Sequence, residues 1–281
     1  MNAEHRIYAY SLISALLYSI WGMLVLMTIR AGLSPGSSGL LVYSFASALV
    51  LASGGSVEGP RAEWVASGII YASANLTLFY IMTLTYLSSA YIFVPSSILV
   101  FYFLSLRGSS IRRSEALRSS LGIITIVAGL CLSQMEGLAG IDLRSLALGL
   151  IAAMLYGIAS YLTMVSVSPG REVSESFWIL LSELLVFLPA SLAEGLRLSG
   201  GPLVYAAAAG ASVGLGLVLE LHSFRLSEGS SSRFKLINIV NVLTNMDTVL
   251  IAIASVIIGS YTAFGVIGLL LVFAGASVFY R

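Results

Sequence analysis

Residues Ile13–Ile20, ISALLYSI, return 138 positions later as Ile151–Ile158, IAAMLYGI. A second pair lies further along the chain, where Leu121–Gly129, LGIITIVAG, reads on Ile267–Gly275, IGLLLVFAG, at an offset of 146. Self-similarity at a fixed spacing is the signature of an internal repeat. We therefore divide the chain into two halves, residues 1–138 and residues 139–281, with a break near 136–144.

The chain that carries this repeat is too apolar for a water-soluble protein. Hydrophobic residues make up 58% of its 281 residues, charged residues only 10%, and the mean hydropathy is +0.98. A soluble domain has about 25% charged residues, so the composition indicates an integral membrane protein. The first apolar run is too long for a cleavable signal peptide. The single cysteine, Cys131, lies in an apolar run and excludes a disulfide framework.

Segments long enough to cross a bilayer can be placed ten times. They are Tyr8–Thr28, Gly36–Gly54, Trp64–Leu84, Ser88–Leu106, Ser119–Gln134, Ser145–Val167, Ser176–Leu192, Pro202–Leu221, Ser232–Ile257 and Tyr261–Phe279. Each half holds five segments, and because five is odd the two halves insert with opposite orientations. The sequence predicts an all-α membrane protein of ten transmembrane helices in two inverted five-helix repeats. This is an architecture of secondary transporters that expose a central site alternately to the two sides.

Positive charges set the expected orientation. With a cytoplasmic N-terminus, eleven of the fourteen basic residues fall on the inside and three, Arg30, Arg144 and Arg197, fall on the outside. Basic residues concentrate in cytoplasmic loops, so we expect both termini in the cytoplasm. The absence of long tails favours the cell membrane of a prokaryote.

Two longer stretches resemble the EamA-like, ten-helix proteins of the drug/metabolite transporter superfamily. Residues 86–104, YLSSAYIFVPSSILVFYFL, followed by Gly122 and Gly129, look like that family's fourth and fifth helices, with Pro95 at its usual proline. Residues 224–240, FRLSEGSSSRFKLINIV, resemble the stretch that joins its helices eight and nine. The chain departs from the family by lacking a proline near Arg233 and by having Arg107-Gly108-Ser109 in place of a Gly-Glu pair.

The resemblance covers nearly the whole chain, although its motifs are loose hydrophobic patterns. It implies a transporter of a small metabolite. Its central cavity would be lined by the third, fourth, eighth and ninth segments, with help from the first and sixth. The superfamily handles amino acids, nucleotide sugars, phosphorylated sugars and cationic drugs, so the resemblance does not select one substrate class.

Polar residues interrupt the ninth apolar segment. At about 100° per residue, Asn238, Asn241 and Asn245 fall within roughly 60° of one another on a helix, with Lys235 beside them. Lipid cannot satisfy amides or an ammonium, so this face is predicted to line a substrate path, together with Asn75 in the third segment. The alternatives are that the asparagines join helices by hydrogen bonds and that Lys235 reaches the membrane surface.

Aromatic residues could shape the same pocket. They are Tyr18, Trp21, Tyr80, Tyr91, Tyr156 and Trp178. Tyr18 and Tyr156 stand out because the repeat places them at equivalent positions. Aromatic residues of membrane helices also serve in packing and in interface belts, so this alternative stays open.

Three carboxylates, Glu183, Glu220 and Asp247, lie within the predicted spans. An ionised carboxylate is costly there unless it is paired, which makes each a candidate proton carrier. Glu183 lies in the middle of its segment and Glu220 lies near His222, and these two glutamates are our candidates for coupling. Glu220 could instead form a salt bridge with Arg225 or Arg233. Asp247 is off the asparagine stripe and is the weaker candidate.

We expect a transporter that moves a small polar metabolite by alternating access. Lys235, the only lysine, favours a cargo with an acidic group: an amino acid, an organic acid or a phosphorylated metabolite. One alternative is a proton-coupled exporter of drugs or cations, which would depend on Glu183 and be indifferent to Lys235. The other is a non-transporting membrane protein that binds lipid or assists assembly.

An enzyme is disfavoured, because the sequence has no phosphate-binding glycine loop, no nucleophile elbow and too few histidines for a metal cluster. No cofactor or metal is expected. The basic residues between Arg107 and Arg118 follow from topology, so nucleic acid is not an expected partner. The expected partners are a small-molecule substrate, coupling protons and membrane lipids, and a homodimer is left open.

Overall fold

The structure is a computed structural model that describes residues 3–54, 57–84, 94–107, 113–133, 143–196, 201–228, 230, 232–247, 250 and 263–280. Within these residues it is all-helical. The elements are α1 (Ala3–Arg30), α2 (Pro35–Ala52), α3 (Ala62–Leu84), a 3-10 turn η1 (Val94–Ser96), α5 (Ser97–Arg107), α6 (Arg113–Ser133), α7 (Leu143–Ser166), α8 (Glu172–Ala193), α9 (Leu203–Glu228), α10 (Arg233–Thr244) and α12 (Ala263–Tyr280).

Seven of the described helices, α1, α2, α3, α6, α7, α8 and α9, are long and apolar enough to cross a membrane. These helices indicate a multi-pass membrane protein, as the composition predicted. Each of the ten predicted spans overlaps a described helix. The helices within the fourth and ninth spans are short, since α5 has 11 residues and α10 has 12. The remaining parts of those two spans lie mostly outside the described residues.

Local sequence signals set several helix ends. Ser34 caps α2, where its hydroxyl accepts a hydrogen bond from the Ser37 backbone N–H at 3.3 Å, and Pro35 occupies the first helical position. At the C-terminal end of another helix, α8 ends at Ala193, and Gly195 follows with φ +77°. A left-handed residue just beyond a helix is most easily supplied by glycine, so Gly195 marks where α8 stops.

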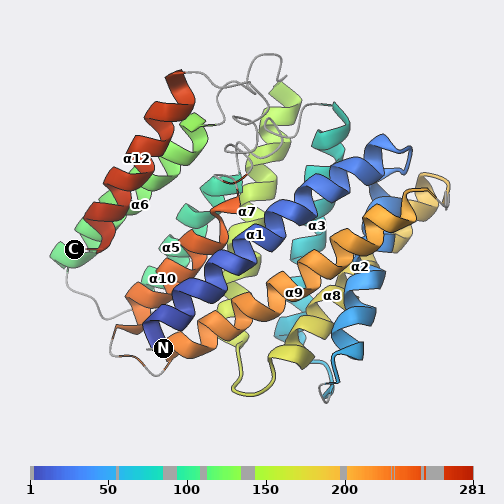
Figure 1. Cartoon of the computed structure of the whole chain (residues 1–281), viewed down its shortest axis with the longest axis horizontal. Helices are drawn as coiled ribbons and strands as arrows, with labels where there is room; N and C mark the ends of the chain where they lie inside the picture. The colour runs from blue at the N-terminus through green and yellow to red at the C-terminus, as the bar shows by residue number, and fades with distance from the viewer. Residues whose placement is uncertain are drawn as a thin grey trace.

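The helices pack mainly in antiparallel pairs (Figure 1). Two contacts show that α1 and α9 are antiparallel. The ring of Tyr10 lies 5.2 Å from the ring of His222, and the Ser14 hydroxyl, one turn later on α1, donates to the carbonyl oxygen of the earlier residue Gly216 at 2.8 Å. Figure 1 accordingly shows the N-terminus beside the end of α9. Three further pairs are α3 with α7, α2 with α8, and α6 with α12.

Helices α6 and α12 meet through glycines and stand at one edge of the bundle (Figure 1). A Cβ atom on Gly129 would lie 2.5 Å from the Gly268 carbonyl oxygen, and a Cβ on Gly275 would lie 2.7 Å from the Gly122 carbonyl oxygen. Only residues without a side chain permit this backbone approach. These are the four glycines that the repeat aligns, which explains why the motif recurs.

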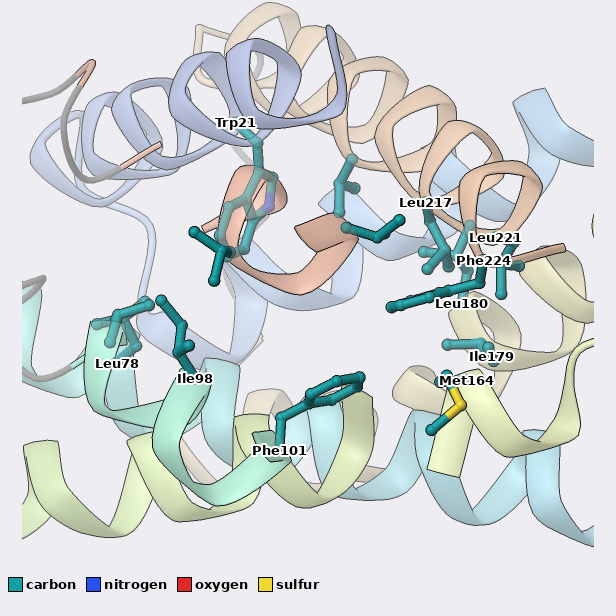
Figure 2. Packing of buried hydrophobic residues seen from close by; sticks show 14 of the residues in the cluster. Trp21, Leu78, Ile98, Phe101, Met164, Ile179, Leu180, Leu217, Leu221 and Phe224 are labelled. Carbon is teal, nitrogen blue, oxygen red and sulfur yellow. The ribbon is translucent and has the colours of Figure 1, made fainter. Parts of the chain in front are cut away.

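Aromatic side chains dominate the core between the other helices. Tyr43 of α2 stacks on Phe187 of α8 at 5.2 Å between ring centroids, and Phe187 packs against Phe79 of α3 at 5.6 Å. On another side of the interior, Phe101 of α5 and Phe224 of α9 are stacked 6.0 Å apart, and Figure 2 shows both extending into the bundle. These buried rings pack five helices of the bundle together, α2, α3, α5, α8 and α9.

Candidate functional site: a carboxylate-lined cavity

A cavity lies within the bundle, and every described α-helix except α6 and α12 contributes a residue to its wall. The cavity volume accessible to water is about 90 Å³. This is enough for a few water molecules or one small polar molecule. Its polar wall consists of Tyr18, Tyr43, Tyr71, Asn75, Ser97, Tyr156, Ser160, Glu183, Glu220, Thr244, Asn245 and Asp247, with the indole of Trp21.

Glu183 of α8 lies on one side of this cavity, with 3% of its surface exposed. Its Oε2 accepts a 2.9 Å hydrogen bond from the Asn75 amide of α3, and the Tyr43 hydroxyl faces the same carboxyl group. The Asn75 side-chain oxygen in turn accepts a hydrogen bond from the Tyr156 hydroxyl of α7. Three helices therefore hold this carboxyl group in the cavity wall.

Glu220 of α9 lies across the cavity and is bound by α1. The Tyr18 hydroxyl donates a 2.5 Å hydrogen bond to its Oε2. The alternative predicted from the sequence, a salt bridge from Glu220 to Arg225 or Arg233, is wrong. Arg225 instead binds Glu172 of α8 at 2.5 Å, and Arg233 contacts Glu228 at 3.4 Å.

Those corrected pairings have a simple geometric cause. Arg225 lies in the last turn of α9, whereas Glu172 lies in the first turn of α8. His222 also lies 3.4 Å from Glu172. Glu172 thus pairs with both Arg225 and His222, and Glu220 lines the cavity.

Asp247 brings a third carboxyl group to the cavity, although projection on a regular helix placed it away from the asparagine stripe. Helix α10 ends at Thr244, and its C-cap Asn245 has φ −84° and ψ 5°. A 100° step per residue applies only within the helix, so it fails for residues beyond 244. The backbone carbonyl of Asp247 also accepts from the Ser19 hydroxyl of α1 at 3.3 Å, which fixes this segment against α1.

The structure divides the predicted asparagine stripe. Asn245 lines the cavity and its side-chain oxygen accepts a 3.3 Å hydrogen bond from Ser97. Asn238 and Asn241 are buried but lie outside the cavity wall. The Asn238 amide donates to the Phe234 carbonyl oxygen at 2.8 Å and contacts the Ser105 hydroxyl at 3.4 Å. Asn238 therefore joins α10 to α5, as the packing alternative proposed.

Lys235 and Tyr80 also lie outside the cavity wall. Lys235 is the third residue of α10 and is half-buried. Tyr80 is 41% exposed and its hydroxyl donates to the carboxylate of Glu194, near the end of α3. Tyr91 lies outside the described residues. The cavity thus unites Tyr18, Tyr156, Asn75, Asn245, Glu183 and Glu220 from the predicted set.

Sequence reasoning did not single out several wall residues, among them Tyr43 and Tyr71. Each is one tyrosine in an apolar segment with no repeat partner, so the sequence held no signal that separated them from packing residues. The sequence predicts Trp21 only as one of six aromatic residues that could shape the pocket. Its indole N–H is buried in the wall, and it has no hydrogen-bond partner in the part of the chain that the structure describes. An unmet donor of this kind is costly in the interior and is available to a bound acceptor.

The charge of the wall is one-sided. Glu183, Glu220 and Asp247 line it, and none of its described residues is Lys, Arg or His. Across the described ranges no salt bridge reaches Glu183 or Glu220. Nor do those ranges hold a group of three or more His, Cys, Asp or Glu arranged to bind a metal ion. The site can therefore attract a cation or hold protons.

Comparison with known proteins supports the fold but assigns no family. No family model matches the chain, and the search of curated proteins finds no match. A solved structure titled "Crystal structure of protein" resembles it with a TM-score of 0.72 and 16% sequence identity, and the similarity covers 96% of this chain and 95% of the other. At this identity the likeness shows a shared fold over nearly the full length.

Proposed function

We propose that the protein is a secondary transporter whose cargo carries an ammonium group, and that the cargo exchanges with protons on the cavity carboxyl groups. The observation that carries the proposal is the wall itself: three carboxylates, four tyrosines and one tryptophan surround the cavity, without a basic residue among its described lining. Carboxylates and aromatic faces are the groups that recognise ammonium cations. Cationic cargo replaces the acidic cargo that Lys235 suggested.

Intramembrane carboxylates are costly and mark ion or proton pathways in transporters. Glu183 and Glu220 are each held by a neutral donor, Asn75 and Tyr18 respectively. A neutral donor leaves the charge of a carboxylate to be balanced by a proton or by cargo. Competition between the two for the same oxygens is sufficient to couple them, with Glu183 and Glu220 as the coupling residues.

Alternating access requires two halves that can rock about the cavity, and two matched contacts support the inverted repeat. Tyr18 donates to Glu220, whereas Tyr156, its counterpart at an offset of 138, donates to Asn75. Correspondingly, α1 packs on α9 and α10, and α7 packs on α3 and α5. Both patterns follow if an inverted 5+5 fold relates the halves, as the resemblance to the drug/metabolite transporter superfamily implies.

The proposal is tested by the thermal stability of the purified protein with and without candidate cargo. A ligand that binds only the folded state stabilises it by about 2.7 kcal/mol at a hundred times its Kd. Putrescine and tetramethylammonium should raise the melting temperature, and citrate and glucose 6-phosphate should not. Flux of the stabilising amine into proteoliposomes, driven by a proton gradient, then separates transport from binding. Stabilisation by the anions alone would overturn the proposal.

A further inference from the structure

A column of polar side chains runs between α3 and α7, away from the cavity. Tyr71 and Ser160 share a hydrogen bond of 2.9 Å, and one turn further Ser67 and Thr163 share one of 2.5 Å. The hydroxyls of Ser67 and Thr163 belong to fully buried residues. The column begins at the cavity, because Tyr71 and Ser160 belong to its wall.

The other end of the column is a buried acid. The Ser166 hydroxyl lies 2.8 Å from Oε1 of Glu175 and 3.0 Å from the Thr163 carbonyl oxygen, and its single hydrogen can be donated to either. Glu175 lies in the first turn of α8 and is 0% exposed. No salt bridge reaches it from the described residues. A carboxyl group is seldom buried without an ionic partner, so its place at the end of a hydroxyl column calls for a reason.

The charged and polar groups that face Glu175 come from three elements. The Arg61 guanidinium lies nearby at the start of α3, the Ser168 backbone adjoins it after α7, and Glu172 lies one turn earlier on α8. Glu172 is itself bound to Arg225 and His222 of α9. Glu175 therefore lies just inside the group of ion pairs at this end of the bundle.

The chemistry of the column suits proton transfer. A hydroxyl group both donates and accepts a hydrogen bond, so each oxygen can receive one proton and release its own to the next oxygen, and it stays neutral. The Tyr71–Ser160 pair lies about one turn of α3 and of α7 from the Ser67–Thr163 pair, so one short step separates the two hydrogen-bonded pairs. Ser166 follows Thr163 by three residues, a rise of about 4.5 Å along α7, and one water molecule can bridge a gap of this size between their hydroxyl groups.

We propose that this column conducts protons between the cavity carboxyl groups and Glu175, and that Glu175 exchanges them with the solution at the end of the bundle where α8 begins. A proton leaves the carboxyl group of Glu175 for the Ser166 hydroxyl, each hydroxyl passes one proton on, and a cavity carboxylate receives the last. Tyr71 lines the same cavity as Glu220 and Glu183, so either can be the acceptor. The inference rests on the proposed function only in that the cavity carboxyl groups change protonation during transport.

The alternative is that the hydroxyls merely hold α3 and α7 together. Thr163→Val removes one hydroxyl and keeps the side-chain shape, and Glu175→Gln removes the terminal acid. The matched control is Ser37→Ala, which breaks a buried 2.9 Å hydroxyl pair with Ser191 between α2 and α8, outside the column and the cavity wall. All three variants should melt within a few degrees of one another if they remain folded.

The experiment is a pH jump on the purified protein, followed by the infrared carbonyl bands of its carboxyl groups. Glu183→Gln and Glu220→Gln identify the cavity bands. We expect Glu175→Gln and Thr163→Val each to slow protonation of the cavity groups at least tenfold, while Ser37→Ala reacts at the wild-type rate. A wild-type rate in Glu175→Gln or in Thr163→Val would overturn the inference, so either variant alone is sufficient for the test.

A transport measurement separates this inference from the proposed function. In proteoliposomes, exchange of internal for external putrescine needs no proton to leave the protein and should survive in Glu175→Gln. Proton-driven putrescine uptake should fall about tenfold in the same variant. Wild-type protein that neither binds nor moves putrescine would count against the proposed cargo. The pH-jump rates would still decide whether the column conducts protons.

Discussion

The side-chain amide of Asn75 lies between two helices and binds both, donating to Glu183 of α8 at 2.9 Å and accepting from Tyr156 of α7. Asn75 and Glu183 are 4% and 3% exposed. The amide orients a buried carboxyl group without neutralising its charge. This relationship makes Glu183 the most informative residue to change.

Glu183→Gln keeps the shape of the side chain and removes its charge. A hydrogen bond to a charged group contributes about 1.5–3 kcal/mol, so the affinity for an ammonium cargo should fall between about tenfold and a hundredfold. Lys235→Ala, outside the cavity wall, should leave that affinity unchanged. Isothermal titration with the stabilising amine measures both. An amine affinity that is unchanged in Glu183→Gln would contradict the proposed role of this carboxyl group.

Tyr18→Phe removes the hydroxyl that binds Glu220 at 2.5 Å. A buried acceptor that loses its donor costs about 1–3 kcal/mol, and we expect the free energy of unfolding to fall by that amount. Tyr156→Phe should have a similar effect, because Asn75 loses the corresponding bond. The control is Tyr80→Phe, where the phenol is 41% exposed and a change within about 0.5 kcal/mol is expected. Denaturant titration in detergent compares the three.

Gly129→Ala tests the contact between α6 and α12. Its Cβ would lie 2.5 Å from the Gly268 carbonyl oxygen, a backbone atom that cannot yield without moving its helix. Overpacking typically costs about 1–3 kcal/mol, so the variant should melt at a lower temperature. Gly59→Ala has no atom within 4 Å of the added carbon and serves as the control. Equal melting temperatures would mean that the two helices do not pack as described.

Arg225→Ala and Arg233→Ala compare two ion pairs of different burial. Arg225 binds Glu172 at 2.5 Å, where the acid is 10% exposed, whereas Arg233 and Glu228 are 3.4 Å apart and 50% and 30% exposed. The Arg225 side chain is itself 37% exposed, so solvent screening limits the loss to about 1 kcal/mol. Arg233→Ala should change stability by less than half of that. Melting curves at low and high salt measure both, and the Arg225 effect should shrink with salt.

The repeat and the hydropathy of the sequence were sufficient to locate a helix in each predicted span and to mark Tyr18 and Tyr156. They succeeded because long apolar segments must form helices in lipid, and because the repeat identified residues in pairs. The inverted 5+5 arrangement and the transporter family stay predictions.

The asparagine stripe shows where sequence reasoning failed. The ninth span, Ser232–Ile257, is predicted as one regular helix, but α10 ends at Thr244. Asn245 and Asp247 line the cavity, while Asn238 binds α5. Nothing in the local sequence required this stop, because no glycine or proline follows Thr244 for several residues. The segment after the helix end is hydrogen-bonded to Ser19 of α1, a contact that the local sequence does not indicate.

The paired contacts of Tyr18 and Tyr156 also bear on energy balance. If identical halves exchanged conformations, the inward-facing and outward-facing states would have equal free energies. Here one tyrosine binds the acid Glu220 and its counterpart binds the amide Asn75. Because an acid changes its charge with pH and an amide does not, the proposed exchange of the two environments would make the free-energy difference between the two states depend on pH. In the proposed transporter, the chemical difference between two matched positions would therefore set which side the resting cavity faces.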